Sequence, residues 1–268
     1  MKIGNREFDF SHKTYIMGIL NVTPDSFSDG GKWNDMDKAL QHVEDMIHEG
    51  ADVIDVGGES TRPGHEQITD EEEIDRVAPV IAAVKKRFDV PVSVDTYKSA
   101  VARAALAEGA DLINDIWGFK YDEKMAGVAA EWDAACCLMH NKNGTQYRDF
   151  MKDMMEETLE CVRIAQKAGV KKDRILLDPG IGFGKTYEMN LEALRRLKEF
   201  CDLGYPVLLG TSRKSVIGLA LDLPSDQRVE GTLATTVLGV LAGCAFVRVH
   251  DIRENRRAIQ MTEAILGK

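Results

Sequence analysis

The 268-residue sequence lacks several features that would place it in a specialised class of protein. No run approaches the roughly 18 apolar residues that a membrane-spanning helix requires. The first residues, MKIGNREFDFS, contain no apolar stretch typical of a signal peptide. Basic residues are not in surplus, because the formal net charge is −10, and this argues against a nucleic-acid partner. We therefore expect a cytoplasmic globular protein that binds neither membrane nor nucleic acid.

Cysteines are also few, and their spacing matches no metal site. There are five, an odd number, and this favours reduced, mostly buried thiols in the cytoplasm. The shortage of positive charge has a further consequence. An acidic chain that binds an anion must gather its basic residues locally, so basic residues at strand ends become candidates for anion binding.

What the sequence does contain is one structural unit, repeated eight times. The expected strands are 15–20, 53–56, 91–94, 111–113, 134–138, 175–177, 206–209 and 246–249. The expected helices are 35–48 (or 37–48), 69–86, 99–108, 122–131, 149–168, 187–200, a short one from 214, 229–241 and 254–266. Thr69 is the expected N-cap of the second helix, with Glu72 completing a capping box.

Strict alternation of strand and helix implies a parallel sheet with right-handed crossovers. Eight units in this length match a single-domain α/β fold, the (β/α)8 or TIM barrel, spanning residues 1–268. A doubly wound open sheet is the alternative. Residues 1–14 are a candidate hairpin covering the bottom of the barrel.

In such a barrel the carboxyl ends of the strands converge on one face, where active sites lie. Residues that follow the strands then become neighbours although they are far apart in sequence. They are Asn21, 57–62, Asp95, Asn114, Met139, His140, Asp178, 210–215, Arg248 and His250.

The segment 174–185, RILLDPGIGFGK, is the most informative of these strand ends. Asp178 ends an apolar strand, and a glycine-rich turn carrying Phe183 follows. This arrangement suits a flat heterocycle, because the carboxylate accepts from two N–H groups on one edge while the ring stacks on Phe183. A tight turn with a capping aspartate explains the segment equally well in isolation. The similar ends of the other strands favour the heterocycle site.

Asp95, Asn114 and Asp178 supply acceptors and one amide donor for a nitrogen-rich ring, with Met139 and Phe183 as apolar walls. Each of the aspartates also has a simpler explanation, as a cap of the helix that follows.

A second group of strand-end residues suits a polyanion. Arg248 and His250 are two residues apart on one strand and therefore point the same way. With Arg62 and Asn21 they form a candidate polyanion pocket, since arginine binds phosphate bidentately. The TSRKS segment, 211–215, begins a short helix whose N-terminus attracts a carboxylate or phosphate. Pairing of these basic residues with surface carboxylates, or with solvent, is the alternative.

The motifs at the strand ends closely resemble those of the dihydropteroate synthase family, in order and over nearly the whole chain. They are NVTPDSFSDGG (21–31), DVGGESTRPG (55–64), SVDT (93–96), INDIWG (113–118), LMH (138–140), LDPGIGFGKT (177–186), LLGTSRKS (208–215) and FVRVHD (246–251). Departures from the family pattern, in the loop 141–148 and at His65 and Leu233, touch none of the site residues.

The resemblance implies a transferase of folate biosynthesis on a TIM barrel. Such an enzyme joins 6-hydroxymethyl-7,8-dihydropterin pyrophosphate to p-aminobenzoate, giving 7,8-dihydropteroate and pyrophosphate. Mg²⁺ assists the reaction, sulfonamides compete with p-aminobenzoate, and the family habit is a homodimer.

The resemblance also implies a role for each matching residue. The pterin residues are Asp95, Asn114, Met139, Asp178, Phe183, Gly210 and Lys214. The pyrophosphate residues are Asn21, Arg62, Arg248 and His250, and Asn21 also contacts Mg²⁺. The residues of the p-aminobenzoate site and its loops are Phe27, Asp29, Thr61, Arg62, Pro63 and Ser215. The catalytic residues are Asp95, Lys214, Arg248 and His250.

Two other functions are compatible with a pterin-binding barrel. One is the pterin-binding domain of a corrinoid-dependent methyltransferase, which would need neither the TSRKS nor the VRVHD segment. The other is a non-catalytic relative, which would have eroded loops. Because the SFSDGG, STRPG, TSRKS and VRVHD segments are all complete, the sequence favours the synthase.

Overall fold

The computed structural model describes residues 1–23, 31–60 and 67–268, with the backbone alone described for 31–35. Its centre is a sheet of eight strands in the order β8-β7-β6-β5-β4-β3-β10-β9, in which neighbouring strands run parallel. The strands are β3 (Tyr15–Asn21), β4 (Val53–Gly57), β5 (Val92–Asp95), β6 (Leu112–Asp115), β7 (Ala135–Met139), β8 (Ile175–Asp178), β9 (Leu208–Leu209) and β10 (Phe246–Val249).

The two ends of this sheet meet, which makes it a barrel. Leu177 on β8 forms a parallel bridge with Val207, just before β9, and its N–H donates to the carbonyl of Pro206 at 2.9 Å. The predicted (β/α)8 barrel is therefore confirmed, and the doubly wound open sheet is wrong.

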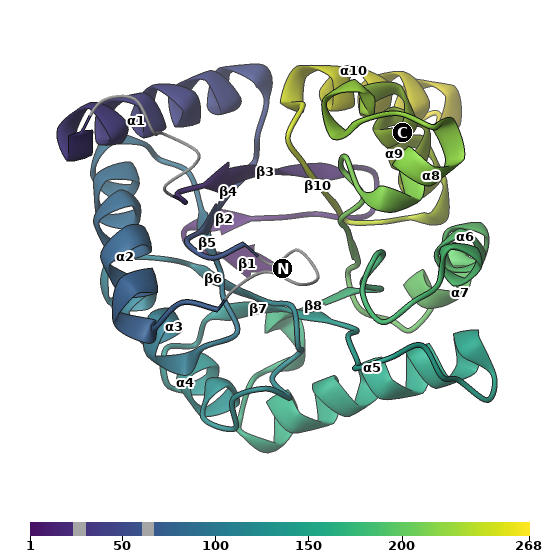
Figure 1. The fold of residues 1–268 in the computed structure, drawn as a ribbon, viewed down its shortest axis with the longest axis horizontal. Coiled ribbons are helices and arrows are strands. Elements are labelled where there is room, and N and C mark those ends of the chain that lie inside the picture. Colours follow the sequence, from purple (N-terminus) through teal and green to yellow (C-terminus); the bar gives the residue numbers. More distant parts are fainter. Residues whose placement is uncertain (24–30, 61–66) are drawn as a thin grey trace.

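Helices surround the ring of strands (Figure 1). They are α1 (Gly31–Glu49), α2 (Asp70–Arg87), α3 (Ser99–Ala107), α4 (Met125–Glu131), α5 (Phe150–Lys167), α6 (Tyr187–Arg195), α7 (Leu197–Cys201), α8 (Ser215–Leu221), α9 (Val229–Ala242) and α10 (Ile252–Leu266), with short 3₁₀ turns at η2 (Lys172–Arg174) and η3 (Ser225–Gln227). Among the described residues, none of the helices has the length and hydrophobicity needed to cross a membrane.

Two helix predictions need correction. The single helix expected at 187–200 is wrong, because the chain breaks at Arg196, where φ is −106° and ψ is 20°. The Arg196 guanidinium binds both Glu192 on α6 and Glu199 on α7, an interaction that apolar periodicity does not reveal. The first helix begins at Gly31 rather than at 35 or 37, since a glycine gives no signal for a helix start.

One of the two contacts of the predicted capping box of α2 is confirmed. The Thr69 hydroxyl accepts from the N–H of Glu72 at 3.2 Å, which satisfies one of the free donors of the first turn. The Glu72 carboxylate instead accepts from Arg76 Nη2, at 2.5 Å. This pairing one turn along the helix takes the place of the expected return contact.

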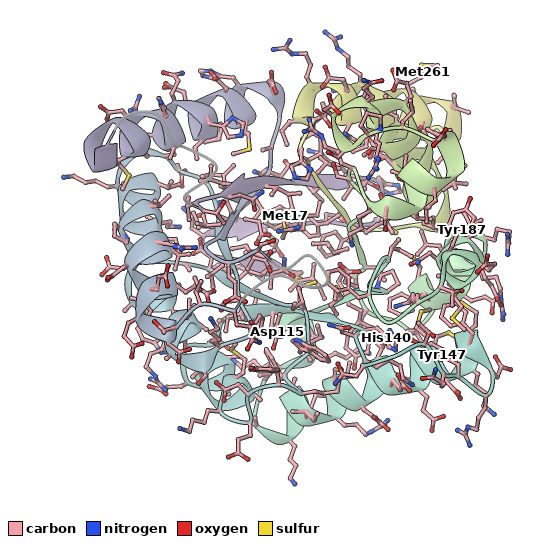
Figure 2. The ribbon with its side chains drawn as sticks, in the orientation of Figure 1. Met17, Asp115, His140, Tyr147, Tyr187 and Met261 are labelled. Carbon is pink, nitrogen blue, oxygen red and sulfur yellow. The ribbon has the colours of Figure 1, made fainter. Side chains whose placement is uncertain are left out.

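Alternate strand residues point outward and inward, and they build two apolar layers. The outward ones pack against the helices, while the inward ones at the amino ends of the strands fill the barrel around Met17, which lies near the middle of the view in Figure 2. A small antiparallel hairpin, β1 (Lys2–Ile3) and β2 (Arg6–Glu7), lies against this inner layer. Ile3 and Phe8 are buried in it, and the Phe8 ring centre lies 5.3 Å from that of Phe246. The bottom of the barrel is therefore apolar.

Candidate active site

An arginine on β10 lies between two buried aspartates at the opposite end of the barrel. Arg248 Nε donates to Asp55 Oδ2 at 2.6 Å, and its Nη2 donates to Asp95 Oδ2 at 2.6 Å. Asn114 Nδ2 donates to the same Asp55 oxygen at 3.2 Å. Strands β4, β5, β6 and β10 each contribute one of these residues, so the barrel brings together side chains that are up to 193 positions apart.

Burial controls the charge of this group. It raises the pKa of Asp95 to about 7, with Arg248 opposing the shift and Asp55 adding to it. Burial works against the charge on Arg248 as well, but Asp55 and Asp95 outweigh it and raise the arginine's pKa. Within the described part of the chain, the second oxygens of Asp55 and Asp95 are buried without a hydrogen-bond partner. Such acceptors suit the N–H groups of a ligand.

A second group gathers around Gly210, just after β9. A Cβ atom placed there would lie 3.5 Å from Asp178 Oδ2, 3.9 Å from Lys214 Nζ and 4.0 Å from Arg248 Cβ. The missing side chain thus leaves space among an acid, a lysine and the central arginine. Burial lowers the pKa of Lys214 to about 8, against the pull of Asp178. Burial likewise raises the pKa of Asp178, and Lys214 opposes it.

The turn after β8 presents an aromatic ring to Lys214. Its start is fixed by Asp178 Oδ1, which accepts from the N–H of Gly180 at 2.6 Å. Lys214 Nζ donates to the carbonyl of Ile181 and lies 4.8 Å from the centre of the Phe183 ring. An apolar cluster separate from the main core, formed by Tyr97, Ile116 and Met139, packs with Trp117 and Phe183. Polar groups beside an apolar wall are the usual composition of a small-molecule site.

The predicted site residues at strand ends therefore come together around Arg248 and around Gly210. The group includes Asp95, Asn114, Met139, Asp178, Phe183, Gly210, Lys214 and Arg248. Asn21 joins it at the end of β3. A Cβ atom at Gly57 would lie 3.6 Å from Asp95 Cβ and 3.7 Å from Asn21 Oδ1, so these two side chains flank Gly57.

His250 and Ser215 lie at the edge of this group. His250 follows β10, and its Nδ1 is 2.9 Å from the Ser212 hydroxyl in the TSRKS segment. Ser215 is exposed as the first residue of α8. The remaining predicted residues, Phe27, Asp29, Thr61, Arg62 and Pro63, lie outside the described residues, as does His65.

Asp55 is the residue that sequence reasoning missed. It lies in the middle of the otherwise apolar strand VIDVG and is fully buried, where it holds both Arg248 and Asn114. The signal was present, because a carboxylate inside an apolar strand needs a buried partner. The partner itself could be found only from the fold.

We predict that Arg248→Met destabilises the fold in a pH-dependent way. The variant leaves Asp55 and Asp95 together without a cation, and breaking a buried pair costs about 3–5 kcal/mol. The pKa of Asp95 is already raised in the folded protein, so the folded variant binds a proton that the unfolded chain releases near pH 4. Stability is then retained at low pH and lost as the pH rises through the folded pKa. Urea unfolding should show a larger loss at pH 8 than at pH 5.

Arg253→Met is the matched control, because Arg253 forms an exposed pair with Glu49. It should cost under about 1 kcal/mol at either pH. Equal losses for Arg248→Met at pH 5 and pH 8 would contradict the charge assignment.

Comparison with known proteins agrees with this site. A family model described as pterin binding enzyme matches residues 17–250. A dihydropteroate synthase of Clostridium beijerinckii is 61% identical over the full length of both chains. That of Bacillus subtilis is 54% identical over 97% of this chain and 91% of the relative.

Solved structures agree equally well. A dihydropteroate synthase of Clostridium difficile, crystallised in the presence of pteroic acid, superposes with a TM-score of 0.95 at 54% identity, covering 98% of this chain and 100% of that one. The Yersinia pestis enzyme with a sulfonamide drug gives a TM-score of 0.93 at 41% identity, covering 100% and 99%. These relatives are synthases, so the methyltransferase alternative is not supported. The chain therefore belongs to the pterin-binding enzymes, as a member of the dihydropteroate synthase family of transferases.

Proposed function

We propose that the mouth of this barrel binds 6-hydroxymethyl-7,8-dihydropterin pyrophosphate and p-aminobenzoate and joins them, releasing pyrophosphate. One observation carries the proposal. Acceptors suited to a heterocycle and a cation suited to a polyanion share one space, around Gly210 and between Asp95 and Asp178. The structure of the Clostridium difficile relative with pteroic acid, which contains a pterin joined to p-aminobenzoate, supports this choice of substrates.

In this proposal the pterin ring lies among the acids and against the apolar wall. Asp95 and Asp178 accept from its N–H groups, while Asn114 and Lys214 donate to its ring nitrogen and oxygen atoms. Met139 and Phe183 pack on the ring. Gly210 matters because it has no side chain, which keeps the space beside Asp178 and Lys214 open.

The leaving group requires the basic residues. Arg248 is oriented by Asp55 and Asp95, and its other N–H groups serve the phosphate oxygens together with His250 and Arg62. As the C–O bond breaks, its electron pair leaves with pyrophosphate, and the carbon attached to the pterin becomes cationic. Asp95 stabilises this cation. The lone pair of the aryl amine then forms the C–N bond, and the protonated nitrogen that results releases one proton to solvent, a step that needs no strong general base.

Asn21 is the residue that would hold Mg²⁺ in this site. The part of the chain described here has no group of three or more His, Cys, Asp or Glu residues arranged for a metal ion. Mg²⁺ often keeps several waters and binds through one or two side chains plus substrate phosphates. Asn21, whose Oδ1 lies beside Gly57 and Asp95, would hold such an ion. When bound, the ion would neutralise negative charge on the leaving oxygens.

The p-aminobenzoate site is proposed at the opening of α8. Ser215 is exposed there, next to Lys214, where the carboxylate of the substrate would lie. Phe27, Asp29, Thr61, Arg62 and Pro63 would complete this site. The Yersinia pestis relative is solved with a sulfonamide drug, which supports sulfonamides as competitors of p-aminobenzoate for this chain too.

The proposed oligomeric state rests on exposed apolar residues, and the proposed compartment rests on the free cysteines. Leu238 and Leu241 on α9, and Met261 and Ile265 on α10, are exposed large apolar residues on neighbouring helices. Figure 2 shows Met261 at the outer edge of the molecule. Apolar surface of this kind marks an interface, and a second copy of the chain is the proposed occupant.

All five cysteines are free, which suits the reducing cytoplasm.

We predict that Lys214→Ala abolishes turnover without unfolding the protein. The substitution removes the donor beside Asp178 and the cation over Phe183, and loss of such a group costs about 100-fold or more in rate. Pyrophosphate release from purified protein, both substrates and Mg²⁺ measures the effect, with circular dichroism as the check on folding. Lys198→Ala, on the exposed surface of α7, is the control. Wild-type turnover by Lys214→Ala would remove this lysine from the site, and an inactive wild type would contradict the proposed reaction.

Arg248→Met should weaken the binding of the diphosphate half of the pterin substrate far more than the binding of its ring. Loss of a charged hydrogen bond to phosphate costs about 1.5–3 kcal/mol, or roughly 10- to 100-fold in affinity. Calorimetric titration at pH 5, below the raised pKa of Asp95, compares the two proteins with this carboxyl protonated in both. It should show this loss for the pterin pyrophosphate and a much smaller one for the pterin alcohol. Equal losses for both ligands would rule out the polyanion role.

Leu241→Glu should convert the proposed dimer to a monomer. A charge at a buried apolar contact cannot be paired there, whereas on a free surface it costs little. Sedimentation velocity should show the dimer mass for the wild type and for Trp132→Glu, which alters an exposed residue beside α4. A monomeric wild type, or a dimeric Leu241→Glu, would contradict the proposed interface.

A further inference from the structure

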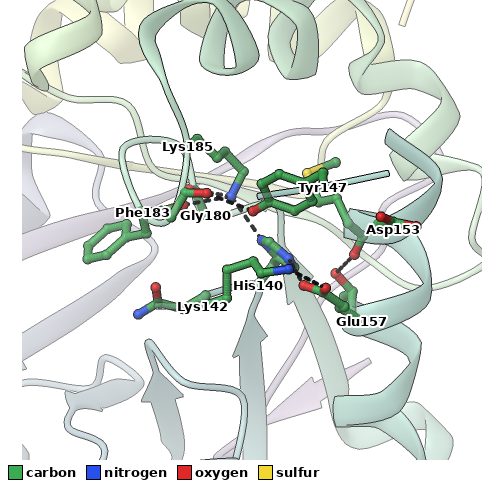
Figure 3. A network of polar contacts seen from close by, with 12 residues as sticks. His140, Lys142, Tyr147, Asp153, Glu157, Gly180, Phe183 and Lys185 are labelled. Atoms are coloured by element: carbon green, nitrogen blue, oxygen red, sulfur yellow. Dashed lines mark hydrogen bonds and ion pairs between the residues drawn. The ribbon is translucent and has the colours of Figure 1, made fainter. Parts of the chain in front are cut away.

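A second lysine lies behind the turn that carries Phe183. Lys185 is the last residue of the segment 174–185, and its side chain folds back against the turn 180–183. The Nζ atom donates to the carbonyls of Gly180 at 2.9 Å and Phe183 at 3.0 Å, and it lies 2.9 Å from His140 Nδ1 (Figure 3). Neither the family motifs nor the proposed chemistry gives this residue a role.

The histidine is fixed by a partner on α5. His140, fully buried after β7, has its Nε2 2.8 Å from Glu157 Oε2. Because a carboxylate only accepts, Nε2 carries the hydrogen, and Nδ1 is left to accept from Lys185. Burial lowers the pKa of His140 to about 2, in agreement with a neutral ring. Lys142 binds the other oxygen of Glu157, at 2.7 Å.

The turn meets the chain after β7 through two glycines, while Ile181 between them is buried in the main core. Gly180 and Gly184 have positive φ angles of 66° and 57°. A Cβ atom at Gly180 would lie 2.0 Å from the carbonyl oxygen of His140, and one at Gly184 would lie 2.7 Å from that of Lys142. The turn is therefore pressed against the chain that follows β7, where only glycine fits, and its carbonyls are held by Lys185.

We propose that Lys185 is a positioning residue, which holds the turn 180–183 against His140 so that Phe183 is in place before the pterin binds. The inference rests on the proposed function and deepens it. Figure 3 shows the Phe183 ring pointing away from the network on the side opposite His140. Lys214 binds the same turn from the ring side, through the carbonyl of Ile181. Two lysines thus bind carbonyls of one turn, Lys214 on the side of the Phe183 ring and Lys185 on the side of His140.

The charge of Lys185 is set by several elements around it. Burial lowers its pKa to about 7, Asp178 and Glu157 oppose that shift, and Lys214 and Lys120 add to it. Both forms are therefore present near neutral pH. The protonated amine has a donor for each of its three acceptors, and the neutral amine keeps two, enough for the two carbonyls of the turn.

The test replaces Lys185 with methionine, which keeps the length of the side chain and removes its donors. Loss of two hydrogen bonds at about 0.5–1.5 kcal/mol each predicts a fall of roughly 5- to 100-fold in affinity for the pterin alcohol, measured by fluorescence titration. KM for the pterin pyrophosphate should rise by a similar factor, while KM for p-aminobenzoate changes less than twofold. Lys142→Met is the matched control, since it removes a lysine of the same network, the one bound to Glu157, and leaves both carbonyl contacts of Lys185 with the turn intact.

A double-mutant cycle with Phe183→Ala distinguishes positioning from general stabilisation. If Lys185 acts through Phe183, the loss of pterin affinity on Lys185→Met should nearly vanish in the Phe183→Ala background. Additive losses, unchanged pterin affinity in Lys185→Met, or an equal loss in Lys142→Met would each overturn the inference. Should Lys185→Met fail to fold, Lys185→Gln, which keeps an amide donor, takes its place in the same cycle with the same deciding outcomes. Because binding of the pterin alcohol needs no turnover, failure here is distinguishable from failure of the proposed reaction.

Discussion

The mouth of the barrel depends on one cation shared by two buried carboxylates. Asp55 and Asp95 lie on adjacent strands, and the Arg248 guanidinium binds an oxygen of each. Without it, Asp95 would bind a proton more readily, because burial raises the pKa of this carboxyl to about 7 even with Arg248 opposing the shift. A protonated aspartic acid donates from one oxygen instead of only accepting. The arginine therefore favours the ionised form of Asp95, which a heterocyclic N–H group requires.

Glycines supply the space in which these charges meet. Gly57 lies between Asn21 and Asp95, and Gly210 lies among Asp178, Lys214 and Arg248. At Gly180 the constraint is different, because a side chain there would collide with the backbone after β7. The first two glycines leave room that a flat ring would use, whereas the third brings the turn close enough for Lys185 to hold it. Space and rigidity thus come from the same residue type at different positions.

Much of this arrangement could be predicted from the sequence, because the barrel places every strand end on one face. Asp95, Asn114 and Asp178 each follow an apolar run, Arg248 lies one residue before the end of another, and the fold converts that pattern into contacts. Asp55 was not predicted because it lies in the middle of a strand. The alternation of a strand shows which side chains point inward, but it does not show which side chains of other strands they contact. The break at Arg196 escaped too, since it depends on ion pairs rather than on apolar spacing.

The charges at the mouth also bear on how the proposed reaction ends. In the proposed complex a pyrophosphate accepts from the N–H groups of Arg248 that Asp55 and Asp95 leave free, because a guanidinium has five donors and the two carboxylates use Nε and Nη2. The charge of Arg248 is then shared between the diphosphate and two carboxylates of the protein. Once pyrophosphate leaves, Arg248 keeps Asp95 in the arrangement observed here. On the proposed function, Asp55 and Asp95 therefore limit how tightly the released diphosphate is held, because they already neutralise much of the charge that attracts it.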